Sequence, residues 1–109
     1  MDISDWRTKI DEIDRKLVDL ISQRAAAAHE IGRLKRKLGM PIYEPDRERD
    51  VFANARKLNS GPLPERDLLR IYERIMDVMR QIQREEIAPE APGSADGSGE
   101  TEFDTEVND

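Results

Sequence analysis

The chain has no cysteine, few aromatic residues and no long hydrophobic run, and each absence narrows the class of protein. Without cysteine among its 109 residues, it has no disulfide, no thiolate metal site and no cysteine nucleophile. Aromatic residues make up 5% of the sequence and charged residues 39%, so a thick, self-sufficient core is not expected. No apolar run approaches the roughly 20 residues that span a bilayer, and the start, MDISDWRTK, lacks the apolar stretch of a signal peptide. We therefore expect a small, soluble, cytoplasmic helical protein.

The net charge of -6 is distributed unevenly along the chain. Residues 88–109 contain seven acidic residues and no basic one, which leaves 17 acidic (24 - 7) against 18 basic residues in 1–87, a balance of +1. Because the charges of 1–87 are mixed and nearly balanced, a nucleic-acid surface is not supported. The segment 88–109 is rich in Pro, Gly, Ser and acids, so we predict a helical domain over 1–87 and a disordered acidic tail over 88–109. The tail is either a solvated extension or a docking segment for another protein.

Apolar residues recur every seven positions in the first third of the chain. One series contains Ile3, Ile10, Leu17, Arg24, Ile31 and Leu38, and the other contains Trp6, Ile13, Leu20, Ala27 and Leu34. Arg24 is the one exception among these eleven seam positions. The pattern predicts a helix from about Ser4, the expected N-cap, to Leu38, with Gly39 as the stop. A helix of about 35 residues is about 50 Å long, too long to be covered by its own chain alone.

Two further helices are predicted, over about 46–58 and 64–86, separated by the turn-forming sequence NSGPLP. The buried face of the first should contain Val51, Phe52, Ala55 and Leu58. The stripe of the second should contain Leu68, Tyr72, Ile75, Met79 and Ile82. With no strand pattern and no internal repeat, the sequence predicts an all-α chain of three helices.

Three cations border the apolar seam of the long helix. Arg24 occupies a seam position, while Arg7 and Lys35 directly follow seam residues. Arg7 and Lys35 are 28 residues apart, about 42 Å along a straight helix, so one copy cannot bring both to one small ligand. Two antiparallel copies can, and a symmetric pair would then have two equivalent sites. We therefore predict a homodimer in which both chains contribute to each site.

The other two helices also carry polar groups on their apolar faces. Arg47 and Glu48 lie four residues before Val51 and Phe52, and Gln83 continues the stripe of the third helix. An unpaired buried charge is costly, so either the charges pair among themselves or an anionic ligand completes them. Taken singly, each has a simpler reading: Arg24 could pair with an inward acid, Arg7 and Lys35 could reach solvent, and Arg47 and Glu48 could belong to a surface network. Together they favour an anion-binding site.

The spacing of these residues resembles that of the all-helical class of chorismate mutase, an intertwined homodimer that converts chorismate to prephenate. The resemblance covers about residues 4–86 and rests on WRTKIDEIDRKLVDLISQRAAAAHEIGRLK, PIYEPDRERDVF and IYERIMDVMRQIQ. The combined pattern is specific: Arg24 follows Arg7 by 17 residues, Lys35 follows by a further 11, and Arg47 by a further 12, with Glu48 next and Gln83 late in the last helix. The family's pericyclic rearrangement needs no nucleophile, metal or cofactor.

The resemblance implies a role for each residue of the pattern. Arg7 of the second chain and Arg24 would bind the two carboxylates of the chorismate dianion. Lys35 and Gln83 would donate hydrogen bonds to the ether oxygen, where negative charge develops. Glu48 would accept from the ring hydroxyl with help from the backbone near Glu44, and Arg47 would hold that acid and complete the positive wall. The expected catalytic residues are thus Lys35, Gln83, Arg24 and Arg47, and the substrate-binding residues are Arg7, Arg24, Lys35, Glu44, Arg47, Glu48 and Gln83.

The chain departs from the family pattern at two positions. Met79 stands where many relatives carry a small hydroxyl residue, and Glu44 stands where an aspartate is often found. Two other interpretations remain open: an isochorismate pyruvate-lyase on the same scaffold, and a non-catalytic helical dimerisation module with internal salt bridges. Because Gln83 is an amide, we expect mutase activity through neutral to mildly alkaline pH.

Overall fold

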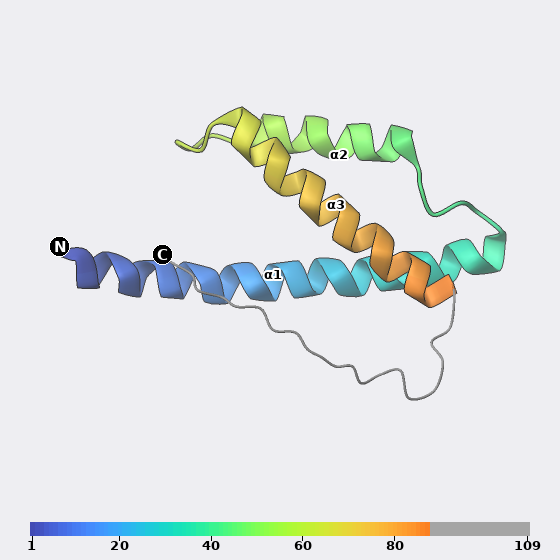
Figure 1. The fold of residues 1–109 in the computed structure, drawn as a ribbon, viewed down its shortest axis with the longest axis horizontal. Coiled ribbons are helices and arrows are strands. Elements are labelled where there is room, and N and C mark those ends of the chain that lie inside the picture. Colours follow the sequence, from blue (N-terminus) through green and yellow to red (C-terminus); the bar gives the residue numbers. More distant parts are fainter. Residues whose placement is uncertain (88–109) are drawn as a thin grey trace. The chain divides into compact units, whose positions relative to one another are not determined.

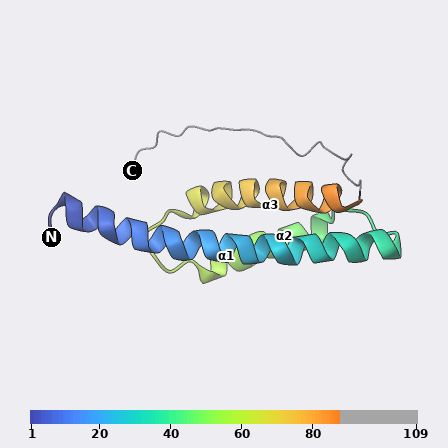
Figure 2. The same cartoon turned by 90° about the horizontal axis from the view of Figure 1, so that it is seen from below.

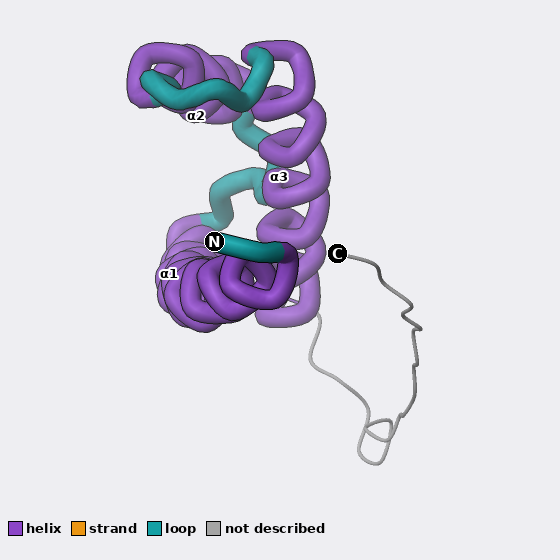
Figure 3. The backbone as a smooth tube through the Cα atoms, turned by 90° about the vertical axis from the view of Figure 1, so that its left-hand side faces the viewer, coloured by secondary structure: helices purple, strands orange, loops and turns teal. Residues whose placement is uncertain are grey.

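The computed structural model describes residues 1–87, which form three helices (Figure 1): α1 (Ile3–Leu38), α2 (Pro45–Leu58) and α3 (Glu65–Ile87). Within this range the chain contains helices and loops and no strand (Figure 3). The predicted all-α class is confirmed, and each helix begins and ends within one residue of its expected boundaries. The prediction of an acidic tail over 88–109 lies outside the described residues and stays a prediction, as does the domain boundary at 87.

Helix α1 is one uninterrupted helix of 36 residues (Figure 2). At its start, the Asp2 carboxylate accepts a hydrogen bond from the Asp5 N–H at 2.9 Å, and the Asp2 N–H donates to the Asp5 carboxylate at 3.1 Å. This reciprocal pair is a capping arrangement in which each acid satisfies the other's backbone donor. The prediction that Ser4 caps the helix is therefore wrong, because Asp2 and Asp5 have the required three-residue spacing and Ser4 already lies inside the first turn.

Helix α1 ends in a turn at Gly39, and this turn sets the direction of the following loop. Gly39 has a φ of 69°, in the left-handed region that favours glycine. Its N–H donates to Arg36 O at 3.4 Å, and the Met40 N–H donates to Lys35 O at 2.9 Å. These two bonds form a Schellman motif, which satisfies carbonyls left without helical partners. The predicted stop at Gly39 is confirmed.

The helices α2 and α3 form an antiparallel hairpin (Figure 1). Pro45 occupies the first position of α2, where its missing N–H costs no hydrogen bond. In the connecting loop, the side-chain amide of Asn59 donates to Leu63 O at 2.9 Å, and α3 begins with the Leu68 N–H donating to Pro64 O at 3.0 Å. The loop thus has its own hydrogen bonds before the chain turns back.

A small core lies within residues 25–87. Its buried apolar members are Ala28, Val51, Ala55, Met76 and Met79. The predicted apolar faces of α2 and α3 largely agree with this set, since the other expected stripe residues of α3 and Phe52 are half-buried. Leu58 is an exception, with 79% of its surface exposed, because it is the last residue of α2, where the chain leaves the helix.

Gly32 is a point of close backbone approach between α1 and α3. A Cβ atom at this position would lie 3.0 Å from Gln83 Cα and 3.2 Å from Gln83 O. Both distances are shorter than ordinary contacts, so only a glycine lets the two helix backbones come together here. In Figure 1 the orange end of α3 meets the cyan part of α1 at this contact.

Residues 3–24 of α1 present large apolar side chains to solvent. Trp6 is 56% exposed and Leu20 60% exposed. The other exposed seam residues of this stretch are Ile3, Ile10, Ile13 and Leu17. A contiguous apolar stripe of this kind is typical of a protein interface. None of the three described helices has the length and apolar character needed to cross a membrane.

Candidate functional site

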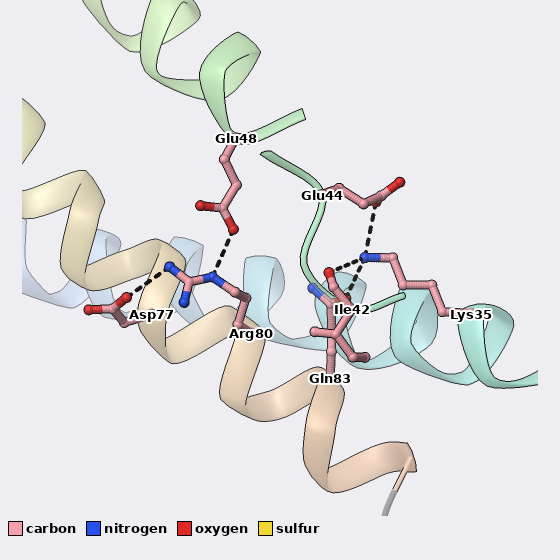
Figure 4. Close-up of polar contacts among 7 residues, drawn as sticks. All are labelled: Lys35, Ile42, Glu44, Glu48, Asp77, Arg80 and Gln83. Atoms are coloured by element: carbon pink, nitrogen blue, oxygen red, sulfur yellow. Dashed lines mark hydrogen bonds and ion pairs between the residues drawn. The ribbon is translucent and has the colours of Figure 1, made fainter. Parts of the chain in front are cut away.

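The side chain of Lys35 is the centre of the candidate site (Figure 4). Its residue surface is only 5% exposed. The ammonium donates hydrogen bonds to Ile42 O at 2.7 Å and to Gln83 Oε1 at 2.9 Å, and it forms an ion pair with Glu44 Oε1 at 3.0 Å. Two of its three N–H donors are thus used in hydrogen bonds, and the Glu44 carboxylate supplies the opposite charge. The bonds to Glu44 and the two amide-type oxygens make it possible to bury this charge.

Three parts of the chain bring these partners together. Gly32 lies one turn before Lys35 on α1 and lets Gln83 of α3 approach the helix backbone. The Schellman turn at Gly39 then directs the loop so that Ile42 O and the Glu44 carboxylate reach the same ammonium (Figure 4). Lys35 and Gln83, which were expected to share a site, are thus in contact within a single chain, although they are 48 positions apart.

A second polar cluster lies on the adjacent turn of α3. Arg80 Nε donates to Glu48 Oε2 at 2.8 Å, and Arg80 Nη2 donates to Asp77 Oδ1 at 2.9 Å. The guanidinium also lies 5.6 Å from the centre of the Tyr43 ring. Its hydrogen bond to Glu48 raises the pKa of Arg80 above its ordinary value, so the cation is present throughout the working pH range.

Arg80 was missed by sequence reasoning, although a signal for it existed. It lies four residues after Met76 and three before Gln83, which places it on the same face of α3 as these two residues. The expected partner of Glu48 was Arg47. The structure instead places Arg47 at the surface, and within residues 1–87 it makes no hydrogen bond or ion pair. Within this single chain Arg80, rather than Arg47, is the partner of Glu48, and the role of Arg47 at the site stays a prediction.

The remaining predicted residues lie on α1. Arg24 is half-buried, and residues 1–87 supply it with no ion-pair partner, so its alternative role as the partner of an inward acid is not supported. Arg7 is exposed in the first turns of the helix. His29, the one histidine of the chain, is also exposed.

The site offers donors that suit an oxyanion. Lys35 presents a positive charge, and because Gln83 Oε1 accepts from it, the Gln83 amide N–H₂ is left to donate to a further group. Met79, one turn before Gln83, is buried and contributes no hydroxyl. No group of three or more potential metal-ligating side chains gathers in the described part of the chain.

The three helices and a polar site centred on a buried lysine bonded to a half-buried glutamine define a small all-α protein with an anion-binding type of site. Residues 6–84 match the family described as chorismate mutase type II. The chain belongs to the chorismate mutase type II family. The resemblance read from the residue spacing is thereby confirmed.

Individual relatives agree with this assignment. A chorismate mutase from Methanocaldococcus jannaschii is 31% identical over 84 residues, covering 76% of this chain and 85% of the relative. A bifunctional chorismate mutase/prephenate dehydratase from Aquifex aeolicus is 32% identical over 87 residues, covering 76% of this chain but 24% of the relative. This chain therefore spans about a quarter of the length of that bifunctional relative. A solved chorismate mutase structure (form II) from Thermus thermophilus matches with a TM-score of 0.73 at 30% identity, covering 75% of this chain and 93% of that one.

Proposed function

We propose that this protein is an isomerase that converts chorismate to prephenate. Family membership supports the reaction type, and the observation that carries the proposal is the buried ammonium of Lys35, 2.9 Å from Gln83 Oε1. In the rearrangement one C–O bond breaks while one C–C bond forms, and negative charge develops on the ether oxygen. Donors that are already fixed where this charge appears lower the barrier without having to reorganise.

Lys35 and Gln83 supply these donors. The hydrogen bond from Lys35 fixes the Gln83 carbonyl oxygen and so leaves the amide N–H₂ to point toward a ligand. One of the three oxygens around the Lys35 ammonium must move away before the ether oxygen can approach it. Ile42 O is a backbone atom and Gln83 is held against Gly32, whereas the Glu44 side chain is 38% exposed. Glu44 is therefore the partner that yields to the substrate.

The remaining roles follow the family pattern. Arg24 and Arg7 of a second chain bind the two carboxylates, and Glu48 accepts from the ring hydroxyl with the backbone near Glu44 beside it. Arg47, at the surface, contributes positive potential to the approach of the dianion rather than a bond to Glu48. Since Met79 has no hydroxyl, one carboxylate contact is left to the backbone or water.

The active form in this proposal is an intertwined homodimer with shared sites. The exposed apolar seam of residues 1–24 supports it, because a second copy of α1 running antiparallel would cover this stripe. The 28 residues between Arg7 and Lys35 support it as well, since only a second chain brings a copy of Arg7 to the Lys35 end of the helix.

The first experiment identifies the product. The purified protein is incubated with chorismate and, separately, with isochorismate, and we expect prephenate from the first and no salicylate from the second. The relatives described above carry chorismate mutase in their names, which favours the mutase over the lyase. Lys35→Ala should lower kcat by about 100- to 1,000-fold, the usual cost of one lost oxyanion donor. Salicylate as the product would establish the lyase, and no turnover of either compound would favour a non-catalytic module.

A mixing experiment tests the shared site. Arg7→Ala and Lys35→Ala chains, each inactive as homodimers, are unfolded and refolded together in equal amounts. Half of the dimers should be mixed and each should have one intact site of two, so about a quarter of wild-type activity should return. Recovery requires that Arg7 acts across chains, whereas no recovery would place all the functional groups of one site in one chain.

A further inference from the structure

We infer that Arg80 is a positioning residue that holds the Glu48 carboxylate ready to accept a hydrogen bond from the ring hydroxyl of the substrate. The inference rests on the proposed mutase activity and adds a residue outside the predicted site. Arg80 does not touch the substrate in this scheme. It acts through Glu48.

The Arg80 side chain is fixed from three directions. Its Nε donates to Glu48 at 2.8 Å and its Nη2 to Asp77 at 2.9 Å, while the Tyr43 ring lies 5.6 Å from the guanidinium carbon. The side chains of Arg80 and Glu48 are 24% and 18% exposed, so the pair is better shielded than surface ion pairs. A planar guanidinium bound to two carboxylates has little freedom to rotate, and it passes this constraint on to Glu48.

The bond to Arg80 uses only one oxygen of Glu48. Arg80 Nε bonds to Oε2, and no hydrogen bond to Oε1 occurs within residues 1–87. In Figure 4 the second carboxylate oxygen of Glu48 points away from Nε. A carboxylate oxygen held in this way accepts a hydroxyl proton well, because its orientation is set before the ligand arrives.

The position of Arg80 on α3 connects the Glu48–Arg80 pair to the Lys35–Gln83 pair. Arg80 and Gln83 are three residues apart on one helix face, about 4.5 Å along the axis. Gln83 fixes Lys35 of α1, and Arg80 fixes Glu48 of α2 (Figure 4). One face of α3 therefore sets the spacing between the donor for the ether oxygen and the acceptor for the ring hydroxyl.

The test compares Arg80→Ala and Arg80→Lys with Arg74→Ala as the matched control. Arg74 lies on the same helix, is largely exposed and contacts the same Asp77, at 3.7 Å. For each variant, kcat and KM are measured with chorismate, together with the inhibition constant of a chorismate analogue that lacks the ring hydroxyl. Circular dichroism checks that each variant folds.

We expect Arg80→Ala to lower kcat/KM for chorismate by about 10- to 100-fold, because the hydroxyl acceptor is no longer oriented. The inhibition constant of the analogue without the hydroxyl should change less than about twofold, since that ligand makes no bond to Glu48. Arg80→Lys should recover part of the loss, as it keeps the charge without the two-pronged geometry. Arg74→Ala should behave like the wild type.

A double substitution keeps the inference testable if Arg80→Ala fails to fold. In a Glu48→Gln background, Arg80→Lys should cost no further activity, because the group it positions is already changed. Equal losses in both backgrounds, or an equal loss of affinity for the analogue without the hydroxyl, would overturn the positioning role and leave the mutase activity standing. A wild-type protein that produces no prephenate would overturn the proposed function first, and the role of Arg80 with it.

Discussion

Residues 1–24 leave Trp6, Leu17 and Leu20 in solvent, whereas residues 25–87 bury the ammonium of Lys35 with two hydrogen bonds and an ion pair. In the first region apolar groups lack cover, and in the second polar groups are satisfied by their own chain. Residues 25–87 thus contain both the buried apolar core and the buried charge, whereas the apolar seam of residues 1–24 lies in solvent. In the proposed dimer, the first region would be covered by a second copy, whereas the polar contacts of the second region are already made within one chain.

The largest effect is expected from a charge placed in the exposed seam of residues 1–24, which tests whether this seam is the dimer interface. Leu17→Glu should abolish the dimer and lower activity by about 100-fold or more, because a carboxylate would have to enter an apolar interface. Sedimentation velocity and prephenate formation measure the two effects. Lys16→Glu, the adjacent position off the seam, is the matched control and should remain dimeric. A dimeric, active Leu17→Glu protein would show that the seam is not the interface.

A substitution at Gly32 tests the packing of residues 25–87. Gly32→Ala places a methyl group 3.0 Å from Gln83 Cα, so α3 must shift and take the amide away from Lys35. A displacement of this size should reduce kcat by about 10- to 100-fold. Gly61→Ala is the control, since a Cβ there has no neighbour within 4 Å. The proposed role of the Gly32 contact fails if both variants retain full kcat.

The salt bridge between Glu44 and Lys35 is a further test of residues 25–87, because its carboxylate is partly exposed whereas its ammonium is buried. Glu44→Gln should lower KM by about three- to tenfold with kcat nearly unchanged, since the substrate no longer competes with a charged neighbour for Lys35. Steady-state kinetics separate the two constants, and Glu73→Gln, an exposed acid on α3, is the control. An increase in KM would instead make the Glu44 side chain a binding group for the substrate.

The smallest effect expected is that of pH. Between pH 6 and 9 the wild-type kcat should vary by less than about threefold, because the Gln83 amide does not titrate and the pKa of Arg80 is raised further above this range by Glu48. Gln83→Glu is the informative contrast, since a carboxylic acid donates only while protonated. Its activity should fall as the pH rises above the acidic range, and a wild-type profile of that shape would contradict the role of the amide.

The helices were predictable to within one residue, because their apolar periodicity and their stop signals are local properties of the sequence. The cap at Asp2 was missed because Ser4 is an equally good capping residue and spacing alone does not choose between them. Lys35 and Gln83 were singled out by their places along the apolar faces, and the family resemblance supplied their shared role; their contact beside Gly32 agrees with it.

Residue types alone did not reveal which arginine pairs with Glu48. Arg47 is its neighbour in sequence, but Arg80 lies opposite it across the α2–α3 packing, 32 residues away. A pairing between helices depends on their relative rotation, which the packing of Val51, Ala55, Met76 and Met79 determines. The same limit applies to Glu44, whose carboxylate reaches Lys35 only because of the path of the loop.

A Cβ atom at Gly39 would have no neighbour within 4 Å, so space alone would allow another residue there. Its positive φ nevertheless sets the course of the loop that brings Ile42 O and Glu44 to Lys35. When this loop is replaced by that of a relative, residues 39–45 should therefore be exchanged together. If the exchanged segment began after Gly39, the loop would leave α1 in a direction set by a different residue.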